Sequence, residues 1–249
     1  MSGFFQSFMD YLDKRRHLKN TPPPAEHPAP PAPPQADYCE EERDTVERYI
    51  GDAFGTIGRT YYDAGTQLPR IDVAVAEPTP SRNFYTLSTV GMGANQMKVP
   101  PELAERNQAF AELTVCLPPD WDFNNDTWPF HMLQHTARLP FEKNDLLNVG
   151  NAYHGPMMRG SGFAAALVVP AATRHGISTR LMLPTGKIVN FYLLIPLYEA
   201  EWREIFDNQS SFAFWERYAR RGGSIVVDPE RSSCAEADEP EGEDAEWTI

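Results

Sequence analysis

The chain has little cysteine and no long apolar run. Cys39, Cys116 and Cys234 lie far apart among 249 residues. An odd, sparse set of cysteines predicts no disulfide framework and fits a reducing compartment. No apolar run approaches the roughly 18 residues that a membrane span needs, and the N-terminus lacks the basic and apolar regions of a secretory signal. We therefore expect a cytoplasmic protein without a membrane span.

Basic residues are also scarce. The chain holds 22 Lys and Arg against 35 Asp and Glu, for a net charge of −13. Nucleic-acid binding needs clustered Lys and Arg beside the phosphates, so this balance argues against that class of partner. An acidic surface can steer a basic protein partner towards its site. Acidity that only keeps the chain soluble is an equally open interpretation.

Complete catalytic motifs are missing. Gly186-Lys187 is followed by isoleucine instead of the Ser or Thr of a P-loop, and Gly91-Met92-Gly93 lacks the third glycine of a dinucleotide loop. Ser161 lacks the first glycine of a nucleophile elbow. Cys116 sits in an apolar strand pattern and is interpreted as a buried small hydrophobe. We expect no enzyme and no cofactor.

Composition divides the chain into four parts. Residues 1–20 place aromatic and leucine side chains at helical spacing, which predicts an amphipathic helix that either docks on a partner or packs on its own domain. Residues 21–37 are rich in proline and predict a semi-rigid linker, although they also contain P-x-x-P spacings. Residues 38–227 form the predicted globular domain. Residues 228–249 carry nine acidic residues and one arginine and predict a disordered tail.

The globular part alternates patterns of period two with patterns of helical period. This mixture predicts an α/β (α+β) fold, a single domain with a central mixed β-sheet covered by helices and with disordered termini. Expected strands cover 70–76, 84–90, 110–117, 163–169 and 188–195. Expected helices cover 40–62, about 127–139, 198–208 and 212–221.

His131 and His135 are the most suggestive metal-ligand pair. Their i, i+4 spacing would place both imidazoles on one face of a helix, as in zinc sites. The pair lacks the glutamate of the His-Glu-x-x-His motif. The alternative is that both histidines lie with Arg138 on a flanking or exposed face of the helix, because Trp128 and Met132 belong to its apolar face, which we expect to be buried.

Two further residues are candidates for binding a partner. His154 lies in a loop-like run between glycines, where it can reach into a cleft or bond a backbone carbonyl. Trp121 follows a Pro-Pro-Asp turn, and large aromatics at loop edges are favoured binding anchors. Packing into the core is the alternative for Trp121.

Four segments together resemble one known family. They are residues 71–92, residues 111–121, the run from Trp128-Pro129 to Pro140, and residues 190–199. Their order and spacing resemble the Suppressor of fused domain, particularly its bacterial versions, across about residues 70 to 200. The signature positions that we assign from this resemblance are Asp72, Gly91, Met92, Glu112, Trp128, Pro129 and Pro196.

The resemblance implies a protein-binding function, because the family has no established catalytic site. Animal members resemble a clamp around a transcription-factor peptide, and bacterial ones are commonly proposed as immunity proteins beside polymorphic toxins. Because few residues follow Glu199, we expect the second domain of the animal clamp to be missing and the clamp mechanism not to transfer. Tyr153 takes the place of the acidic residue that precedes the matching histidine in animals. Only His154 is therefore carried over from the resemblance as a binding residue. With its neighbour Tyr153, and with Trp121 at its loop edge, it forms the set of candidate partner-binding residues.

Three functions remain in consideration. The first is an immunity protein that binds and occludes a cognate, possibly basic, toxin. The second is a regulatory scaffold that sequesters another cytoplasmic protein through residues 1–37. The third is a metal-dependent hydrolase that uses His131, His135 and His154.

Overall fold

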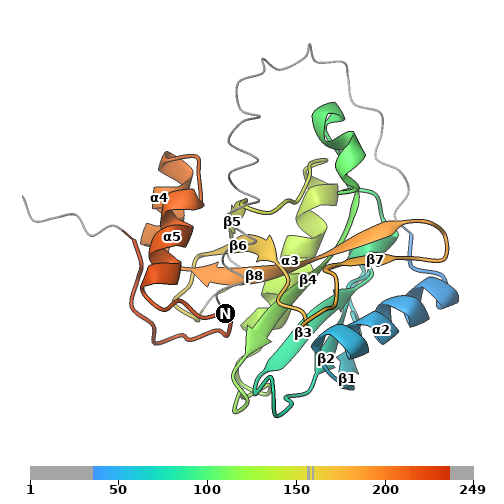
Figure 1. The fold of residues 1–249 in the computed structure, drawn as a ribbon, viewed down its shortest axis with the longest axis horizontal. Coiled ribbons are helices and arrows are strands. Elements are labelled where there is room, and N and C mark those ends of the chain that lie inside the picture. Colours follow the sequence, from blue (N-terminus) through green and yellow to red (C-terminus); the bar gives the residue numbers. More distant parts are fainter. Residues whose placement is uncertain (1–35, 156–157, 159, 236–249) are drawn as a thin grey trace, which may run out of the picture.

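Eight strands form one mixed sheet across the middle of the molecule (Figure 1). The computed structural model describes residues 36–155, 158 and 160–235. The strands follow the order β1-β2-β3-β4-β8-β6-β5, and β7 pairs with β8 beside this path. The strand bounds are β1 Ile57–Tyr61, β2 Asp72–Ala76, β3 Tyr85–Val90, β4 Phe110–Leu117, β5 Ala152–His154, β6 Ala165–Pro170, β7 Arg180–Met182 and β8 Ile188–Leu197.

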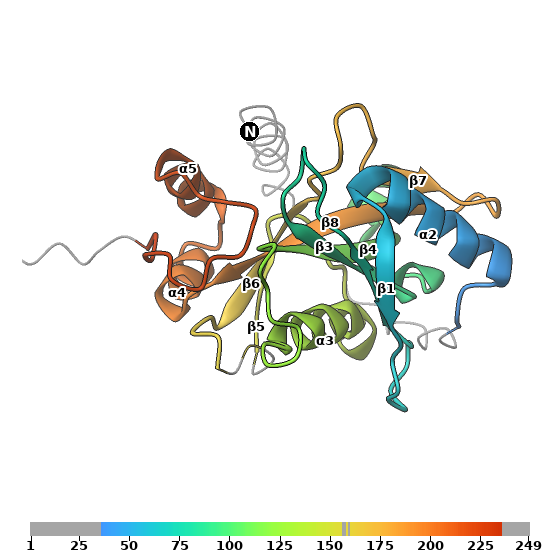
Figure 2. The ribbon, with the colours of Figure 1, turned by 90° about the horizontal axis from the view of Figure 1, so that it is seen from below.

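The centre of the sheet is the parallel pair β4 and β8, and the other pairings between the named strands are antiparallel. Both central strands are buried, as strands covered on two faces should be, and β8 is apolar along almost its whole length. Helix α2 (Glu40–Phe54) covers one face, and α3 (Trp128–Glu142) covers the other (Figure 2). The predicted fold class, a mixed sheet covered by helices, is therefore confirmed.

Two short helices, α4 (Glu199–Asp207) and α5 (Phe212–Arg220), lie at the end of the sheet where β5 and β6 are (Figure 2). Helix α2 lies at the opposite end, over β2 and β3. Two 3-10 turns, η1 (Met92–Ala94) and η2 (Pro101–Arg106), connect β3 to β4. The positions of α4 and α5 agree with the predicted helices to within two residues at each end.

The helix expected over 40–62 is wrong in its second half. Helix α2 ends at Phe54, and residues 57–61 form the edge strand β1 instead. Gly55 has φ 135°, a backbone conformation that residues other than glycine rarely adopt. The helix therefore ends there, and the chain reverses to pair with β2. Strands β5 and β7 were not predicted, because three residues are too few to show a period.

Arg138 is a second correction. It was expected on a flanking or exposed face, but its side chain is 8% exposed. Its guanidinium forms an ion pair with Asp63, and its Nε donates to the carbonyl of Pro69 at 3.2 Å. The loop before β2 covers this side of α3, which sequence periodicity within α3 cannot reveal. Helix α3 also continues through Pro140 to Glu142, past its expected end at Leu139.

The packed chain extends beyond Val227, where the acidic tail was expected to begin. Residues 228–235, which we call the C-terminal strap, lie against α4. The guanidinium of Arg231 reaches both carboxylate oxygens of Glu201 at 2.6 Å, and the amide of Cys234 donates to the same carboxylate at 2.7 Å. Arg231 also lies over the rings of Phe163, Tyr198 and Tyr218. The predicted helix in residues 1–20 and the rest of the predicted tail lie outside the described residues.

Most of the signature positions are structural. The Glu112 carboxylate is fully buried and accepts four hydrogen bonds, from Tyr38 at 2.8 Å, from Thr89 at 2.5 Å, and from the amides of Gly91 and Gly93 at 3.0 Å each. Burial raises its pKa to about 7, against the lowering effect of these bonds. A Cβ at Gly91 would lie 2.2 Å from the carbonyl oxygen of Arg70, so only glycine fits this turn. Glu112 therefore ties η1 to the sheet.

The other signature positions also lie inside the fold. Asp72 is buried in β2, where its carboxylate lies 2.8 Å from the guanidinium of Arg43 and accepts from the amide of Asp63 at 2.9 Å. Met92, Trp128 and Pro129 are buried. Pro196 lies in β8, and its carbonyl accepts from Arg231 at 2.9 Å. These residues hold elements together and do not present a surface to a partner.

Candidate functional site

His154 lies at the end of β5, which is the last strand of the sheet on that side. Its register partner on β6 is Ala165. Side chains alternate along a strand, so the neighbouring Tyr153 points to the other face. The Tyr153 hydroxyl donates to the carbonyl of Leu146 at 3.4 Å, and its ring packs on the main core. Of the two predicted binding residues on this strand, only His154 is exposed.

Helix α4 provides the partners of His154. The Nε2 atom of His154 lies 3.0 Å from the Glu199 carboxylate, and its ring lies 4.4 Å from that of Trp202. Arg203 donates to the other oxygen of Glu199 at 2.8 Å. The hydrogen bond to His154, and then the one from Arg203, lower the pKa of Glu199. The carboxylate is thus ionised in the folded protein at neutral pH.

A row of aromatic rings continues along the same helix. The rings of Trp202 and Phe206 stack 5.3 Å apart, and Phe206 is 65% exposed. On a helix, residues three, four and seven positions apart share one side, and Glu199, Trp202, Arg203 and Phe206 follow this spacing. We call these four residues and His154 the α4 face. It combines the exposed ring of Phe206 and the half-buried ring of Trp202, which also packs on the main core, with one acidic and one basic side chain.

The opposite side of α4 is anchored in the protein. Glu201 and Ile205 are buried, and Glu201 accepts from the amide of Tyr198 at 2.8 Å, which caps the start of the helix. The same carboxylate holds Arg231 of the C-terminal strap. The α4 face is therefore presented by a helix that is fixed from behind.

Trp121 has a different role. Its Nε1 atom donates to the carbonyl of Asp126 at 3.0 Å, and its ring meets that of Trp128 edge-on at 5.8 Å. The side chain is half-buried and packs on the main core. The structure thus places Trp121 at the loop before α3 and not among the residues around His154. Packing was one of the two interpretations drawn from its sequence position.

His131 and His135 do not meet His154, which lies against α4. They line a polar pocket of about 710 Å³ between α3 and the loop before β2, together with Gln134, Glu142 and the Asp63–Arg138 ion pair. Among the described residues there is no group of three or more His, Cys, Asp or Glu side chains that could hold a metal ion. Nothing in the described part of the chain supports the predicted alternative of a three-histidine metal site.

Sequence reasoning missed the other four residues of the α4 face. Residues 198–208 were interpreted only as a helix. The available signal was the pair of aromatics at an i, i+4 spacing, Trp202 and Phe206, on a side that does not share the positions of Glu201 and Ile205. The sequence of α4 does not show which of its sides faces solvent, because that depends on which side packs against the rest of the protein. Within the described residues, no helix is long and apolar enough to cross a membrane.

The sequence model of the family described as Suppressor of fused protein matches residues 67–232. The chain belongs to this family. The matched range reaches into the C-terminal strap, in agreement with the packing of Arg231 on α4. The resemblance predicted from the four sequence segments is confirmed. Suppressor of fused proteins are known as protein-interaction regulators and not as enzymes.

Similar proteins come from bacteria and animals. A Suppressor of fused homolog from Neisseria gonorrhoeae shares the fold with a TM-score of 0.54 and 15% identity, over 77% of this chain and 93% of that one. An uncharacterized protein of Ureaplasma parvum, UU111, is 21% identical over 201 residues, which are 79% of this chain and 96% of that protein. Drosophila Suppressor of Fused aligns with a TM-score of 0.49 and 16% identity, over 84% of this chain and 54% of that one.

Proposed function

We propose that this protein is a non-enzymatic protein-binding module whose partner docks on the α4 face beside β5. Membership of a family of protein-interaction regulators supports the general class. The location on the molecule comes from the site itself. The observation that carries the proposal is the row of rings formed by His154, Trp202 and Phe206 on the outside of α4.

The chemistry of the α4 face suits a protein partner. Large aromatic side chains bury much area with little loss of conformational entropy, and they are enriched where binding energy concentrates. The 65% exposure of Phe206 leaves apolar area for a partner to cover. Glu199 and Arg203 stand at the margin of this row and supply charges of both signs, which favour a specific orientation over general adhesion.

The adjacent strand offers a second kind of contact. Strand β5 ends the sheet on this side, and such a strand can pair with an extended segment of another chain. His154 belongs to both features, because it lies on β5 and contacts α4. A partner that extends the sheet at β5 would therefore meet the aromatic row with its neighbouring side chains.

The finer function that we infer is that of an immunity protein, which binds a cognate toxin and occludes its active site. Two observations support this inference. The net charge of −13 favours encounter with a basic partner, and the family has a bacterial member, in Neisseria gonorrhoeae, that matches this chain over most of both lengths.

The experiment is co-purification with the products of the neighbouring genes, followed by a binding measurement with any captured partner. Replacing both Trp202 and Phe206 with alanine should weaken binding by at least about tenfold, because two central aromatic contacts are lost. A matched control replaces Tyr62 and Leu68, which are 67% and 59% exposed in the loop before β2. Equal weakening by both double variants, or unchanged binding by the first, would refute the location of the site.

Protection of cells against the captured partner tests the finer function. The immunity proposal expects full protection by a chain that lacks residues 1–35. The cut stops before Ala36, whose amide donates to the Asn95 side chain at 2.7 Å. A scaffold that works through its N-terminal segment would instead lose its partner on this deletion. Binding without protection would reject the immunity function and leave the binding module in place.

A further inference from the structure

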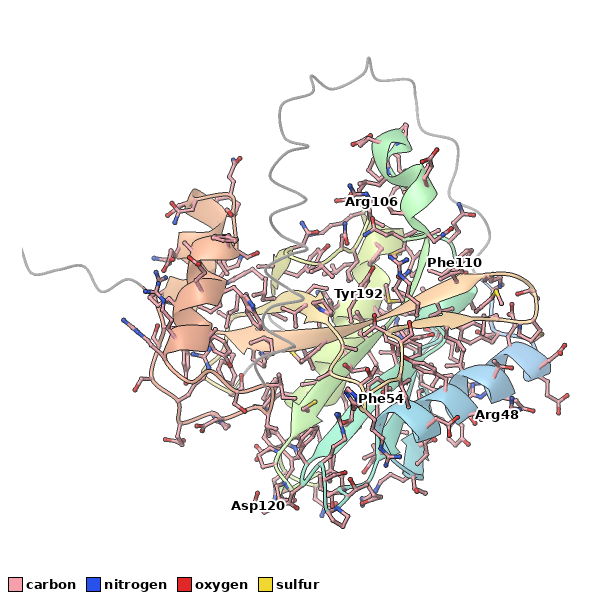
Figure 3. All side chains as sticks on the ribbon, in the orientation of Figure 1. Arg48, Phe54, Arg106, Phe110, Asp120 and Tyr192 are labelled. Atoms are coloured by element: carbon pink, nitrogen blue, oxygen red, sulfur yellow. The ribbon has the colours of Figure 1, made fainter. Side chains whose placement is uncertain are left out.

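Two arginines approach the end of α2. Helix α2 and helix α4 lie at opposite ends of the sheet (Figure 2). Arg82 lies in the turn between β2 and β3, and its guanidinium is 4.6 Å from the ring centre of Phe84 and 6.0 Å from that of Phe54. Phe54 is labelled at the end of α2 in Figure 3. Arg174 follows β6, and its amide donates to the carbonyl of Ala53 at 2.9 Å.

The charge of Arg174 acts on the guanidinium of Arg82. Burial is the main cause that lowers the pKa of Arg82; the Cys116 thiol raises this pKa, and the positive charge of Arg174 lowers it to a smaller extent. The guanidinium of Arg174 also lies 3.7 Å from the position that a Cβ on Gly55 would take, so it too sits at the last residues of α2. Like charges that are held together in a half-buried place repel each other and lose solvation.

No carboxylate of the described residues forms an ion pair with either arginine. The closest candidate along the chain, Glu77, pairs with Arg59 at 3.5 Å. The Nε atom of Arg82 is buried and has no hydrogen-bond partner among the described residues. Among the described residues, the one hydrogen bond of its guanidinium is long, 3.4 Å from a terminal nitrogen to the Thr86 hydroxyl, and the Cys116 thiol interacts with it electrostatically.

The end of α2 offsets only part of this charge. The carbonyl end of a helix is equivalent to about half a negative charge, against two positive charges here. The chain has 13 more acidic than basic side chains, so an unmatched pair of arginines is not a consequence of scarce acids. A buried donor without a partner costs free energy, and an external acceptor would remove that cost.

Two hydroxyl groups stand beside the pair. Thr79 and Arg82 face each other across a tight turn, in which each amide donates to the other residue's carbonyl at 2.8 and 2.9 Å. The hydroxyls of Thr79 and Ser81 lie 3.4 Å apart on this turn and are exposed. The methyl carbon of Thr79 lies 3.6 Å from the place where a Cβ on Gly55 would stand, which Arg174 also approaches, so the turn and Arg174 adjoin one another.

We propose that Arg82 and Arg174, with the hydroxyls of Thr79 and Ser81, form a binding site for an oxyanion, a phosphate or a carboxylate group. Guanidinium groups bind such groups through paired, charge-assisted hydrogen bonds, and hydroxyls add further donors. The site is separate from the α4 face and does not depend on the proposed function.

Inorganic phosphate is the first probe. In a phosphate-free buffer at constant ionic strength, phosphate should raise the thermal unfolding midpoint of the full chain by about 2–4 °C once it exceeds its dissociation constant several-fold. Arg82→Gln and Arg174→Gln should each abolish this rise. Arg48→Gln is the matched control, because Arg48 is exposed on α2 and labelled apart from Phe54 in Figure 3. It should retain the full rise.

A direct readout avoids dependence on the stability of the variants. In the unaltered protein, phosphate should shift the NMR resonance of the Arg82 Nε–H group in a saturable manner, while that of Arg48 stays in place. Equal stabilisation of all the variants, or an Arg82 resonance that does not move, would overturn the proposal. Arg82→Lys keeps the positive charge but lacks the Nε donor. It should therefore bind phosphate more weakly than the unaltered protein does.

Two further experiments distinguish the possible sources of the oxyanion. Citrate in place of phosphate tests whether carboxylates bind as well. Residues 236–249 carry seven acidic side chains and no basic one. If these carboxylates compete for the site, a chain that ends at Ala235 will bind phosphate several-fold more tightly. Unchanged phosphate affinity assigns the site to an external anion.

Discussion

Glu199 and Glu201 lie two residues apart on α4, yet one side of this helix is buried and the other faces solvent. The Glu201 side chain is 0% exposed and forms a two-pronged ion pair with Arg231 of the C-terminal strap. The Glu199 side chain is 43% exposed and pairs with His154 and Arg203, which are both exposed. Both carboxylates pair with an arginine, but Arg231 contacts both oxygens of Glu201 whereas Arg203 contacts one oxygen of Glu199, and the two carboxylates differ in their access to water.

This difference separates the parts of the helix that hold the fold from the parts that can bind a partner. Breaking a buried ion pair leaves a charge without solvent or partner, which is costly. An exposed ion pair contributes little because water replaces either partner. Contacts on the exposed side can therefore change when a partner docks, while the buried side keeps α4 in place.

The largest expected effect follows from removing Arg231. Arg231→Ala leaves the Glu201 carboxylate buried without its cation, and it should lower the free energy of unfolding by about 3–5 kcal/mol. Urea unfolding followed by tryptophan fluorescence measures the change. Arg203→Ala removes an arginine from the exposed side of the same helix and should leave the unfolding midpoint unchanged. Similar losses in the two variants would contradict the contrast between the two sides.

Glu112 provides a second buried carboxylate, on the central strand β4. Glu112→Ala leaves the Thr89 and Tyr38 hydroxyls and the amides of Gly91 and Gly93 without their acceptor. We expect the free energy of unfolding to fall by about 2–4 kcal/mol. Glu105→Ala, at an exposed position of η2, is the control and should be nearly neutral. A neutral Glu112→Ala would show that this network does not stabilise η1.

The pKa of Glu112 also predicts a pH dependence. Its folded value is about 7, above the ordinary 4.5, so the folded protein holds a proton there that the unfolded chain releases. This contribution to stability is complete below about pH 4.5 and is lost as the pH rises through 7, by on the order of 3 kcal/mol. Urea unfolding between pH 5 and pH 8 should show the decline in the unaltered protein. Glu112→Gln, which cannot titrate, should lack this part of it, and parallel curves would reject the raised pKa.

The smallest expected effect concerns the exposed pair. His154→Ala removes the main cause of the lowered pKa of Glu199, so that pKa should rise towards its ordinary value. Titration of the side-chain carboxyl resonance by NMR measures the shift. The unfolding midpoint should stay where it is, because the pair is exposed. A fall in stability as large as that of Arg231→Ala would mean that the α4 face belongs to the fold and is not available to a partner.

Several elements were predictable because their local sequence already contains the physical cause. β4 was predicted with its observed bounds, because Ala111, Leu113, Val115 and Leu117 recur with period two and so share one face of a strand. The start of α3 was predicted from Pro129 in its first turn. The order of these segments also sufficed to predict the family. By contrast, residues 57–61 follow a helical pattern of apolar positions but form a strand, because Gly55 turns the chain onto β2.

The candidate site was only partly predictable. His154 was selected from its position between glycines, but its partners on α4 lie 45 residues away in the chain. The side of α4 that faces solvent depends on the C-terminal strap, which was predicted to be disordered. Residues 228–249 are acidic in total, and disorder was predicted from that total. The prediction gave no weight to the single arginine, Arg231, whose contacts with Glu201 and three aromatic rings order the first part of the segment.

The sequence by itself therefore determined the mixed sheet, its buried strands and its family, because burial of apolar runs is a local property of the chain. Only the tertiary structure decided which carboxylate of α4 is buried, that His154 meets Trp202, and that Arg82 and Arg174 share one end of α2 without an acidic partner among the described residues. These three outcomes depend on charges and rings from distant segments. Their energies are set by exclusion of water, which exists only after the segments have packed.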